Sequence, residues 1–257
     1  MPSDSEAQLR CYRADLHIHT CLSPCADLTM SPARIVKRVG VEMLDIIGIC
    51  DHNSAENVAA TKKVGEKENI KVLAGMEVTS AEEVHIIALF DEVEQVLKLQ
   101  EIVYEHLTPG ENKEALFGEQ IIVNEFDEVE GYCKRLLIGA TTLTLENLVH
   151  EIHNLGGLAI ASHIDRETYS IIGQLGFIPE GLKLDALEIS PHMNKAQALE
   201  RFPEIKKYPL IFASDAHFLH DIGKVTTLFF LEEPTIAEIR KAFNNEEERK
   251  IVMEAGE

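Results

Sequence analysis

The sequence lacks long apolar stretches, an excess of basic residues and a dense set of cysteines. No run of about 18 apolar residues occurs, so we expect no membrane-spanning helix. The start, residues 1–6, is polar and acidic and has neither the basic nor the apolar part of a secretory signal. Five cysteines scattered over 257 residues do not resemble a disulfide framework and fit reduced thiols in the cytoplasm.

Basic residues are few relative to acidic ones, 24 against 44, which gives a formal net charge of −20. A surface of this charge repels polyanions, so we do not expect extended nucleic acid or an anionic membrane as a partner. The excess is uneven, because residues 91–130 hold 12 acidic residues against Lys98 and Lys113. A substrate anion should therefore be small and should bind away from this acidic block.

Short apolar runs alternate with amphipathic segments over most of the chain, which predicts an α/β fold, either a barrel or a doubly wound sheet. The runs are mostly unalternated, as is typical of buried parallel strands. Helices are predicted from Ser31-Pro32 to Gly40, over 144–155, and from a capping box at Thr235 and Glu238 to about Asn244. The predicted strands are Ala14–Ile18, Leu44–Ile49, Lys71–Val78, Val84–Phe90, Leu158–Ser162, Ala186–Ser190, Leu210–Ala213 and Thr226–Leu231.

The acidic block, taken as residues 91–140, interrupts this alternation. Its pattern predicts a helix over 92–106, a loop with Pro109 and Gly110, and then more helix. We interpret it as an acidic helical insertion or subdomain within a single barrel domain that spans residues 1–257.

Histidine, aspartate or glutamate stands at or beside one end of seven consecutive predicted strands. His17 and His19 are two residues apart and share one face of a strand, and Asp215 and His217 repeat this spacing. Each residue alone could be a buried hydrogen-bonded side chain or part of a turn, but together they predict a metal site. Imidazole and carboxylate ligands suit Zn, Mn or Fe, and more than four ligands imply more than one ion. Sites with several ions typically cleave phosphate esters.

Five motifs, in order, resemble the PHP (polymerase and histidinol phosphatase) superfamily. The resemblance covers about residues 14–90 and 157–231 and implies a distorted (β/α)7 TIM-like barrel with a trinuclear metal site at its C-terminal face. It also implies a metal-dependent phosphoesterase. The motifs are Asp15-Leu-His17-Ile-His19-Thr20, Ile49-Cys-Asp51-His52-Asn53, Gly75-Met-Glu77, Ser162-His163 and Ser214-Asp215-Ala-His217.

The resemblance also implies which residues hold the ions. The first ion would be held by His17, His19, Glu77 and Asp215. Glu77 would bridge to a second ion, bound also by His85 and His163, and His52 and His217 would hold the third. The ligands implied for all three ions are His17, His19, His52, Glu77, His85, His163, Asp215 and His217.

One further ligand of the third ion is usual in the family, seven or eight residues after the first histidine. Pro24 and Cys25 stand there in this chain. A Cys25 thiolate would favour Zn or Fe, Asp27 could serve instead, and Cys25 could equally be a free thiol.

His192 competes with His163 for the second ion. The Ser-His…Arg context favours His163, and His192 could then donate a proton to the leaving group.

The remaining expectations concern substrate and reaction. Arg166 is the best candidate for a phosphate clamp and Lys183 a weaker one, and Asp51 is expected to orient a histidine through its second ring nitrogen. Two or three divalent ions (Mn, Fe or Zn) would activate a hydroxide that hydrolyses a small phosphomonoester, a nucleotide or an oligonucleotide end. The alternatives are a non-catalytic PHP-like metal-binding module and an amidohydrolase-type hydrolase, which would need a lysine at a strand end.

Overall fold

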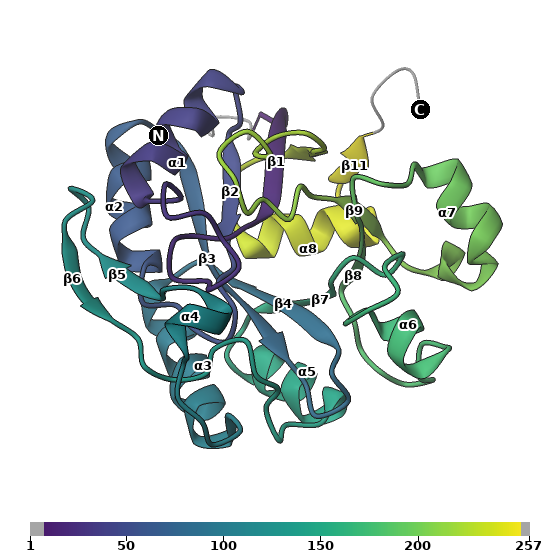
Figure 1. Cartoon of the computed structure of the whole chain (residues 1–257). Helices are drawn as coiled ribbons and strands as arrows, with labels where there is room; N and C mark the ends of the chain where they lie inside the picture. Colours follow the sequence, from purple (N-terminus) through teal and green to yellow (C-terminus); the bar gives the residue numbers. More distant parts are fainter. Residues whose placement is uncertain (1–7, 253–257) are drawn as a thin grey trace.

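One curved sheet organises the protein, shown in Figure 1 as a computed structural model that describes residues 8–252. Its nine strands lie in the order β11-β10-β1-β2-β3-β4-β7-β8-β9. The acidic start at residues 1–6 lies outside the described residues. The strands are β1 (Arg10–Ile18), β2 (Ile46–Ile49), β3 (Lys71–Thr79), β4 (His85–Phe90), β7 (Leu158–Ala161), β8 (Ala186–Ile189), β9 (Leu210–Phe212), β10 (Thr227–Leu231) and β11 (Lys250–Val252).

Helices cover the outside of this sheet (Figure 1). Within residues 8–252, no helix is long and apolar enough to cross a membrane. Ser31 precedes a proline at the first helical position of α1, as predicted, but its hydroxyl donates to Asp127 and does not cap the helix. The Thr144 side chain caps α5, which begins where the sequence predicted a helix. Thr235 caps α8 in the same way, but Glu238 does not complete a capping box, because its carboxylate accepts from the Glu232 N–H and from Arg249. The helices are α1 (Pro32–Val41), α2 (Val58–Lys67), α3 (Val93–His106), α4 (Glu114–Phe117), α5 (Leu145–Asn154), α6 (Ile171–Leu175), α7 (Lys195–Arg201), a 3-10 helix (Pro203–Lys207) and α8 (Ile236–Asn244).

Strand direction differs from the predicted parallel arrangement at β4 and at β10. β4 pairs antiparallel with both β3 and β7, and β10 pairs antiparallel with β1. Burial on both faces makes a strand uniformly apolar whatever its direction, so the sequence pattern did not reveal the inversion. As a result the first residue of β4, His85, lies beside the last residue of β3, Thr79.

The sheet curls until its two sides nearly meet. Just beyond β1 and β9, a bridge joins Ile18 to Ala216, and the Thr227 hydroxyl of β10 donates to the Phe212 carbonyl of β9. The fold is therefore a distorted TIM-like barrel, as the family resemblance implied, and not the doubly wound sheet that the sequence pattern also allowed.

Alternate residues along the strands point into the barrel interior, and β1 departs from this alternation near its C-terminal end. In β3, Leu73 faces inward. Gly75 follows on the same face, where there is no room for a larger residue, because a Cβ atom at this position would lie 2.7 Å from the Ile49 carbonyl oxygen. Leu16 of β1 also faces inward, but a register shift between Asp15 and Ile18 follows, and Ile18 packs in the outer core. Such a bulge re-aims side chains.

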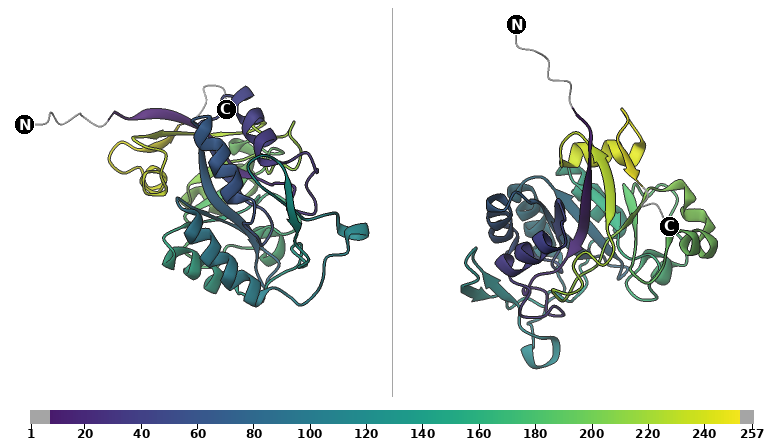
Figure 2. Two further views of the ribbon diagram at one scale, coloured as in Figure 1. Left: turned by 90° about the vertical axis from the view of Figure 1, so that its left-hand side faces the viewer. Right: turned by 90° about the horizontal axis from the view of Figure 1, so that it is seen from above.

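The acidic block is only partly helical. α3 packs its buried residues into the outer core, as a barrel helix does. After the short helix α4, the chain forms a two-stranded hairpin of β5 (Ile121–Val123) and β6 (Val129–Tyr132), where more helix was predicted. The prediction was wrong because Ile121 and Val123 alternate as strand residues and pack on Cys21. Figure 2 shows the loop with α4 projecting from the body.

Candidate metal centre

Titratable side chains gather at one end of the barrel, where β1, β2, β3, β7 and β9 end and β4 begins. Glu77, at 1% exposure, is the centre of this cluster. Its two carboxylate oxygens lie 3.1 to 3.6 Å from ring nitrogens of five histidines: His17, His19, His52, His85 and His163. One carboxylate among five imidazoles is an arrangement suited to bridging cations.

The four residues expected to hold a first ion come together. The Nε2 atoms of His17 and His19 lie 3.4 and 3.1 Å from Asp215 Oδ1. One potential ligand atom of each of His17, His19, Glu77 and Asp215 lies within 4.8 Å of the others. Asp215 has φ of 48° and His163 has φ of 27°, both in the left-handed region, and such backbone strain is concentrated at functional sites.

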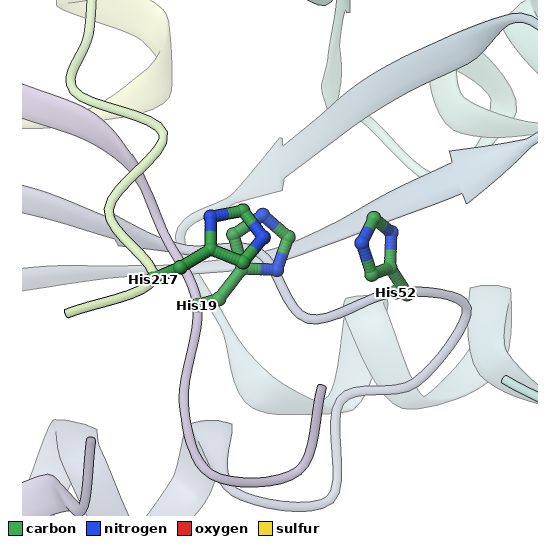
Figure 3. Close-up of side chains that lie close together, drawn as sticks. All are labelled: His19, His52 and His217. Atoms are coloured by element: carbon green, nitrogen blue, oxygen red, sulfur yellow. The ribbon is translucent and has the colours of Figure 1, made fainter. Parts of the chain in front are cut away.

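Two further sets of ligand atoms adjoin the first. His52, Glu77 and His85 form one, and His163 Nε2 lies 3.3 Å from the same Glu77 oxygen that faces His85. The other is His19, His52 and His217, whose rings converge from three separate loops in Figure 3. The second ion would thus have His52 within reach, in addition to the residues that the sequence suggested.

Several atoms at the centre lack a hydrogen bond although they are buried. They are Glu77 Oε1, His52 Nδ1 and His85 Nδ1. A buried polar atom without a partner costs free energy unless something else binds it. Since these atoms point at one another and are of the imidazole and carboxylate type, the residues fit divalent ions.

Three of the histidines are oriented by an acceptor on their Nδ1 atom. Glu188 Oε2 lies 2.9 Å from His17 Nδ1, the Ser23 hydroxyl 2.9 Å from His19 Nδ1, and the Asp215 carbonyl oxygen 2.8 Å from His217 Nδ1. With the proton on Nδ1, the Nε2 lone pair of each ring points into the cluster. Glu188 belongs to β8, and nothing in the sequence pattern assigned it to His17.

Asp51 does not make the expected direct contact with a histidine ring but is linked to His19 through Ser23. Its oxygens accept from the Thr20 N–H and hydroxyl and from the Ser23 hydroxyl, at 2.6 to 2.7 Å. Because Ser23 gives its proton to Asp51, its oxygen accepts from His19. Asp51 therefore orients an imidazole through Ser23, whereas the prediction had it touch the ring.

The charges of the cluster support cation binding. Burial alone would raise the pKa values of Glu77 and Asp215, but the surrounding imidazoles hold both well below their ordinary range. Burial lowers the pKa of His19 well below its usual value. Two carboxylates and a neutral imidazole are thus ready to act as ligands.

Of the two candidates that the sequence left open for the third ion, Cys25 and Asp27, Cys25 lies beside the cluster. Its Sγ lies 3.1 Å from His217 Nε2. Cys25 is exposed as a residue, and although desolvation of its sulfur beside the cluster opposes ionisation, the neighbouring His52 and His217 lower the pKa of Cys25 to about 6. The Asp27 carboxylate instead accepts from the backbone N–H and hydroxyl of Thr29.

The predicted substrate-binding residues fall in different places. Arg166 Nη2 lies 2.7 Å from Asp215 Oδ2, so its guanidinium adjoins the cluster while its side chain is 34% exposed. His192 is exposed just beyond β8, and its N–H donates to Ser190. Lys183 precedes β8 and lines an open pocket with Asp185 and Arg240, at the opposite end of the strand from the cluster. The structure does not bring Lys183 to the site.

Comparison with known families agrees with this geometry. The family model "PHP domain" matches residues 15–177, and the model "PHP-associated" matches residues 197–247. The chain belongs to the PHP family. One curated relative, the uncharacterized protein YqxK of Bacillus subtilis, is 26% identical over 115 residues, which cover 43% of this chain and 30% of that protein.

Solved structures share the fold at low sequence identity. The lesion-specific endonuclease Q of Pyrococcus furiosus superposes with a TM-score of 0.72 at 20% identity, over 95% of this chain and 58% of that one. An endonuclease Q complex with a 27-mer duplex that carries an abasic lesion gives 0.69 at 21%, over 94% and 58%. A protein of Bifidobacterium adolescentis described as a metal-dependent phosphoesterase gives 0.53 at 16%, over 79% and 87%.

This PHP member spans less than two thirds of the length of YqxK and of the endonuclease Q chains. Family membership and the buried His/Glu/Asp cluster together support a metal-dependent hydrolase.

Proposed function

We propose that this protein is a metal-dependent phosphoesterase. The observation that carries the proposal is the position of Arg166, whose guanidinium forms an ion pair with Asp215 at the edge of the histidine cluster. A planar, permanently charged donor group beside cation ligands suits a phosphate, since arginine contacts phosphate oxygens in a bidentate way. Its partial exposure leaves it open to a substrate.

The residues divide the work as follows. His17, His19, Glu77 and Asp215 would hold one ion; His52, His85 and His163 with Glu77 a second; and His52, His217 and Cys25 a third. Bound divalent ions supply Lewis acidity and lower the pKa of water at such sites. Arg166 binds and neutralises the phosphate, and Glu188 and Ser23 keep His17 and His19 in the tautomer that ligation needs. His192, exposed beyond β8, is the candidate proton donor to the leaving group.

The substrate class includes small phosphomonoesters, nucleotides and oligonucleotide ends. Similarity to endonuclease Q over more than nine-tenths of this chain favours a second candidate, cleavage within a DNA strand. Net charge led us not to expect extended nucleic acid, yet a protein of this fold binds duplex DNA. Charge summed over a chain says little about one face, and cations at the mouth would offset local acidity. Nucleic acid is therefore kept as a possible partner.

The other two functions have less support. A non-catalytic module would tolerate loss of ligands, whereas every predicted cluster position here keeps a donor atom. An amidohydrolase-type centre would bridge its ions with a modified lysine, and Glu77 already occupies the bridging position among five histidines.

A test combines metal analysis with a substrate screen. We expect the purified protein to contain Mn, Fe or Zn, or to gain activity when one is supplied, on phosphorylated metabolites, nucleotides or short oligonucleotides. His17→Ala and Asp215→Asn should each lower both metal content and turnover, whereas the exposed His150→Ala should change neither. Phosphoesterase activity that survives both cluster variants would refute the assignment.

A further inference from the structure

The loop that follows β7, residues 163–170, brings three kinds of chemistry to the mouth of the metal centre. His163 supplies an imidazole to Glu77, and Arg166 supplies a guanidinium to Asp215. Tyr169, three residues further on, supplies an aromatic ring, which is 40% exposed. The first two fit the proposed function, and nothing so far assigns the third.

Contacts with two other parts of the barrel and one hydrogen bond within the loop hold it in one conformation. The Asp165 carboxylate accepts from the N–H and the hydroxyl of Ser190, at 2.9 and 2.6 Å. The Ser170 hydroxyl donates to the Arg166 carbonyl at 2.6 Å. The Tyr169 carbonyl accepts from the His85 N–H at 2.8 Å, which ties the loop to the start of β4. Groups on this loop are therefore preorganised relative to the cluster.

The Tyr169 ring lies flat against the imidazole of His85. The ring centroids are 4.6 Å apart, and the planes are inclined by 16°. The backbone of Tyr169 is left-handed, with φ of 57°, a strained conformation for a bulky side chain. Such strain is kept where surrounding structure enforces it, and here it keeps a large apolar ring partly in solvent beside ligands of the proposed ions.

We infer that Tyr169 is a specificity-determining residue that packs its ring against a planar nucleobase of the phosphate ester bound at Arg166. The inference rests on the proposed function and narrows its substrate class to nucleotides, either free or at an oligonucleotide. An aromatic face attracts a planar base by stacking, whereas a sugar or polyol phosphate would need polar partners instead. Stacking also needs no basic surface, so it suits a chain with a net charge of −20.

The experiment compares substrates with and without a base. We would measure kcat/KM of the metal-loaded enzyme for a nucleoside monophosphate, a short oligonucleotide and glycerol phosphate. Tyr169→Ala should lower the ratio of nucleotide to glycerol phosphate roughly 5- to 100-fold, the range for loss of one stacked base, and Tyr169→Phe should keep it. Phe177→Ala, another exposed aromatic residue shortly after the loop, should leave the ratio unchanged. The oligonucleotide compared with the mononucleotide tells whether the base belongs to a strand or to a free nucleotide.

A binding measurement gives a readout that does not depend on turnover. The chain has no tryptophan, so Tyr169→Trp introduces a single reporter of base stacking. Nucleoside monophosphate should quench its fluorescence, and glycerol phosphate should not.

An unchanged selectivity ratio in Tyr169→Ala, at equal metal content, overturns the inference. So does an equal loss for all substrates, which would mark a structural role beneath His85. Absence of phosphoester hydrolysis by the wild-type protein with every metal would instead defeat the proposed function.

Discussion

The Nδ1 atom of His17 lies 2.9 Å from a carboxylate oxygen of Glu188, and neither side chain is accessible to solvent. The other Glu188 oxygen accepts from the His163 N–H at 3.1 Å. One buried carboxylate thus positions two proposed ligands, one through its ring and one through its backbone. Although burial alone would lower the pKa of His17, Glu188 and the other nearby carboxylates raise it well above its usual value.

Replacing Glu188 should weaken metal binding without removing a ligand. We expect Glu188→Ala to reduce metal affinity roughly 10- to 100-fold, the effect typical of losing such an outer partner. Glu188→Gln should lose less, because its amide oxygen still accepts one of the two hydrogen bonds. Competition with a chelator measures the affinity. Glu180→Ala, at an exposed position, is the matched control. Equal affinity in all three proteins would contradict the positioning role.

Cys25 is predicted to set the composition of the third ion site. Its Sγ lies 3.1 Å from His217 Nε2, and the pKa of its thiol is lowered to about 6 although desolvation opposes this. Cys25→Ser should therefore lower the number of tightly bound ions by about one and reduce the preference for Zn. Elemental analysis gives the number, and in the cobalt-substituted protein the sulfur-to-cobalt charge-transfer band should disappear. The exposed Cys11→Ser should keep both. A Cys25 variant with an unchanged ion count and spectrum would show that the thiol is not a ligand.

Replacing Arg166 and replacing Lys183 should have different effects on kcat/KM, although the sequence suggested both residues as phosphate ligands. Arg166→Ala should lower kcat/KM roughly 100-fold, the usual cost of losing one electrostatic partner of the transition state. Arg166→Lys should recover part of it, because a point charge replaces a bidentate one. Lys183→Ala should change kcat/KM little, because that side chain lies at the other end of β8. A larger loss for Lys183→Ala than for Arg166→Ala would contradict the placement of both.

The C-terminal strand depends on a partly buried ion pair. Arg249 Nε donates to Glu238 at 2.8 Å, and both side chains are 11% exposed. Arg249→Met should lower the free energy of unfolding at neutral pH, because the Glu238 carboxylate loses its guanidinium partner. The pKa of Glu238 is held below its ordinary value by Arg249, although burial opposes this.

Because that pKa is lowered in the folded state, the stabilisation is complete above the unfolded-state pKa and is lost as the pH falls through the folded-state value. The difference between wild type and Arg249→Met in urea denaturation should therefore shrink below about pH 4. The exposed Arg201→Met serves as control. A difference that stays constant down to acidic pH would mean that Arg249 acts by packing alone.

The sequence predicted what depends on local pattern. Uninterrupted apolar runs located the barrel strands, and Ser31 with Pro32 located the start of α1. Family motifs brought His17, His19, Glu77 and Asp215 into one predicted set, and the structure places them together.

Features that depend on long-range contacts could not be read in this way. Apolar composition does not encode the reversed direction of β4, and nothing near Glu188 marks it as the partner of His17, 171 residues away. The sequence also did not show that Asp51 reaches His19 through Ser23, because the folded loop brings Ser23 between the two side chains. The hairpin after α4 was mistaken for helix because β5, with 3 residues, and β6, with 4, are so short that the alternation of Ile121 and Val123 was not recognised.

The bridge between Ile18 and Ala216, which brings the neighbouring residues His19 and Asp215 together, has a consequence for biosynthesis. His19 and Asp215, which approach to 3.1 Å, are 196 residues apart, so nearly the whole chain must leave the ribosome before they can pair. Contacts of such sequence separation form late, after the local ones. A nascent chain that ends before β9 would carry His17, His19 and Glu77 but lack their fourth partner. Metal uptake at this site would then be among the last steps of maturation. A chain that ends before β9 would fail to retain metal at this site.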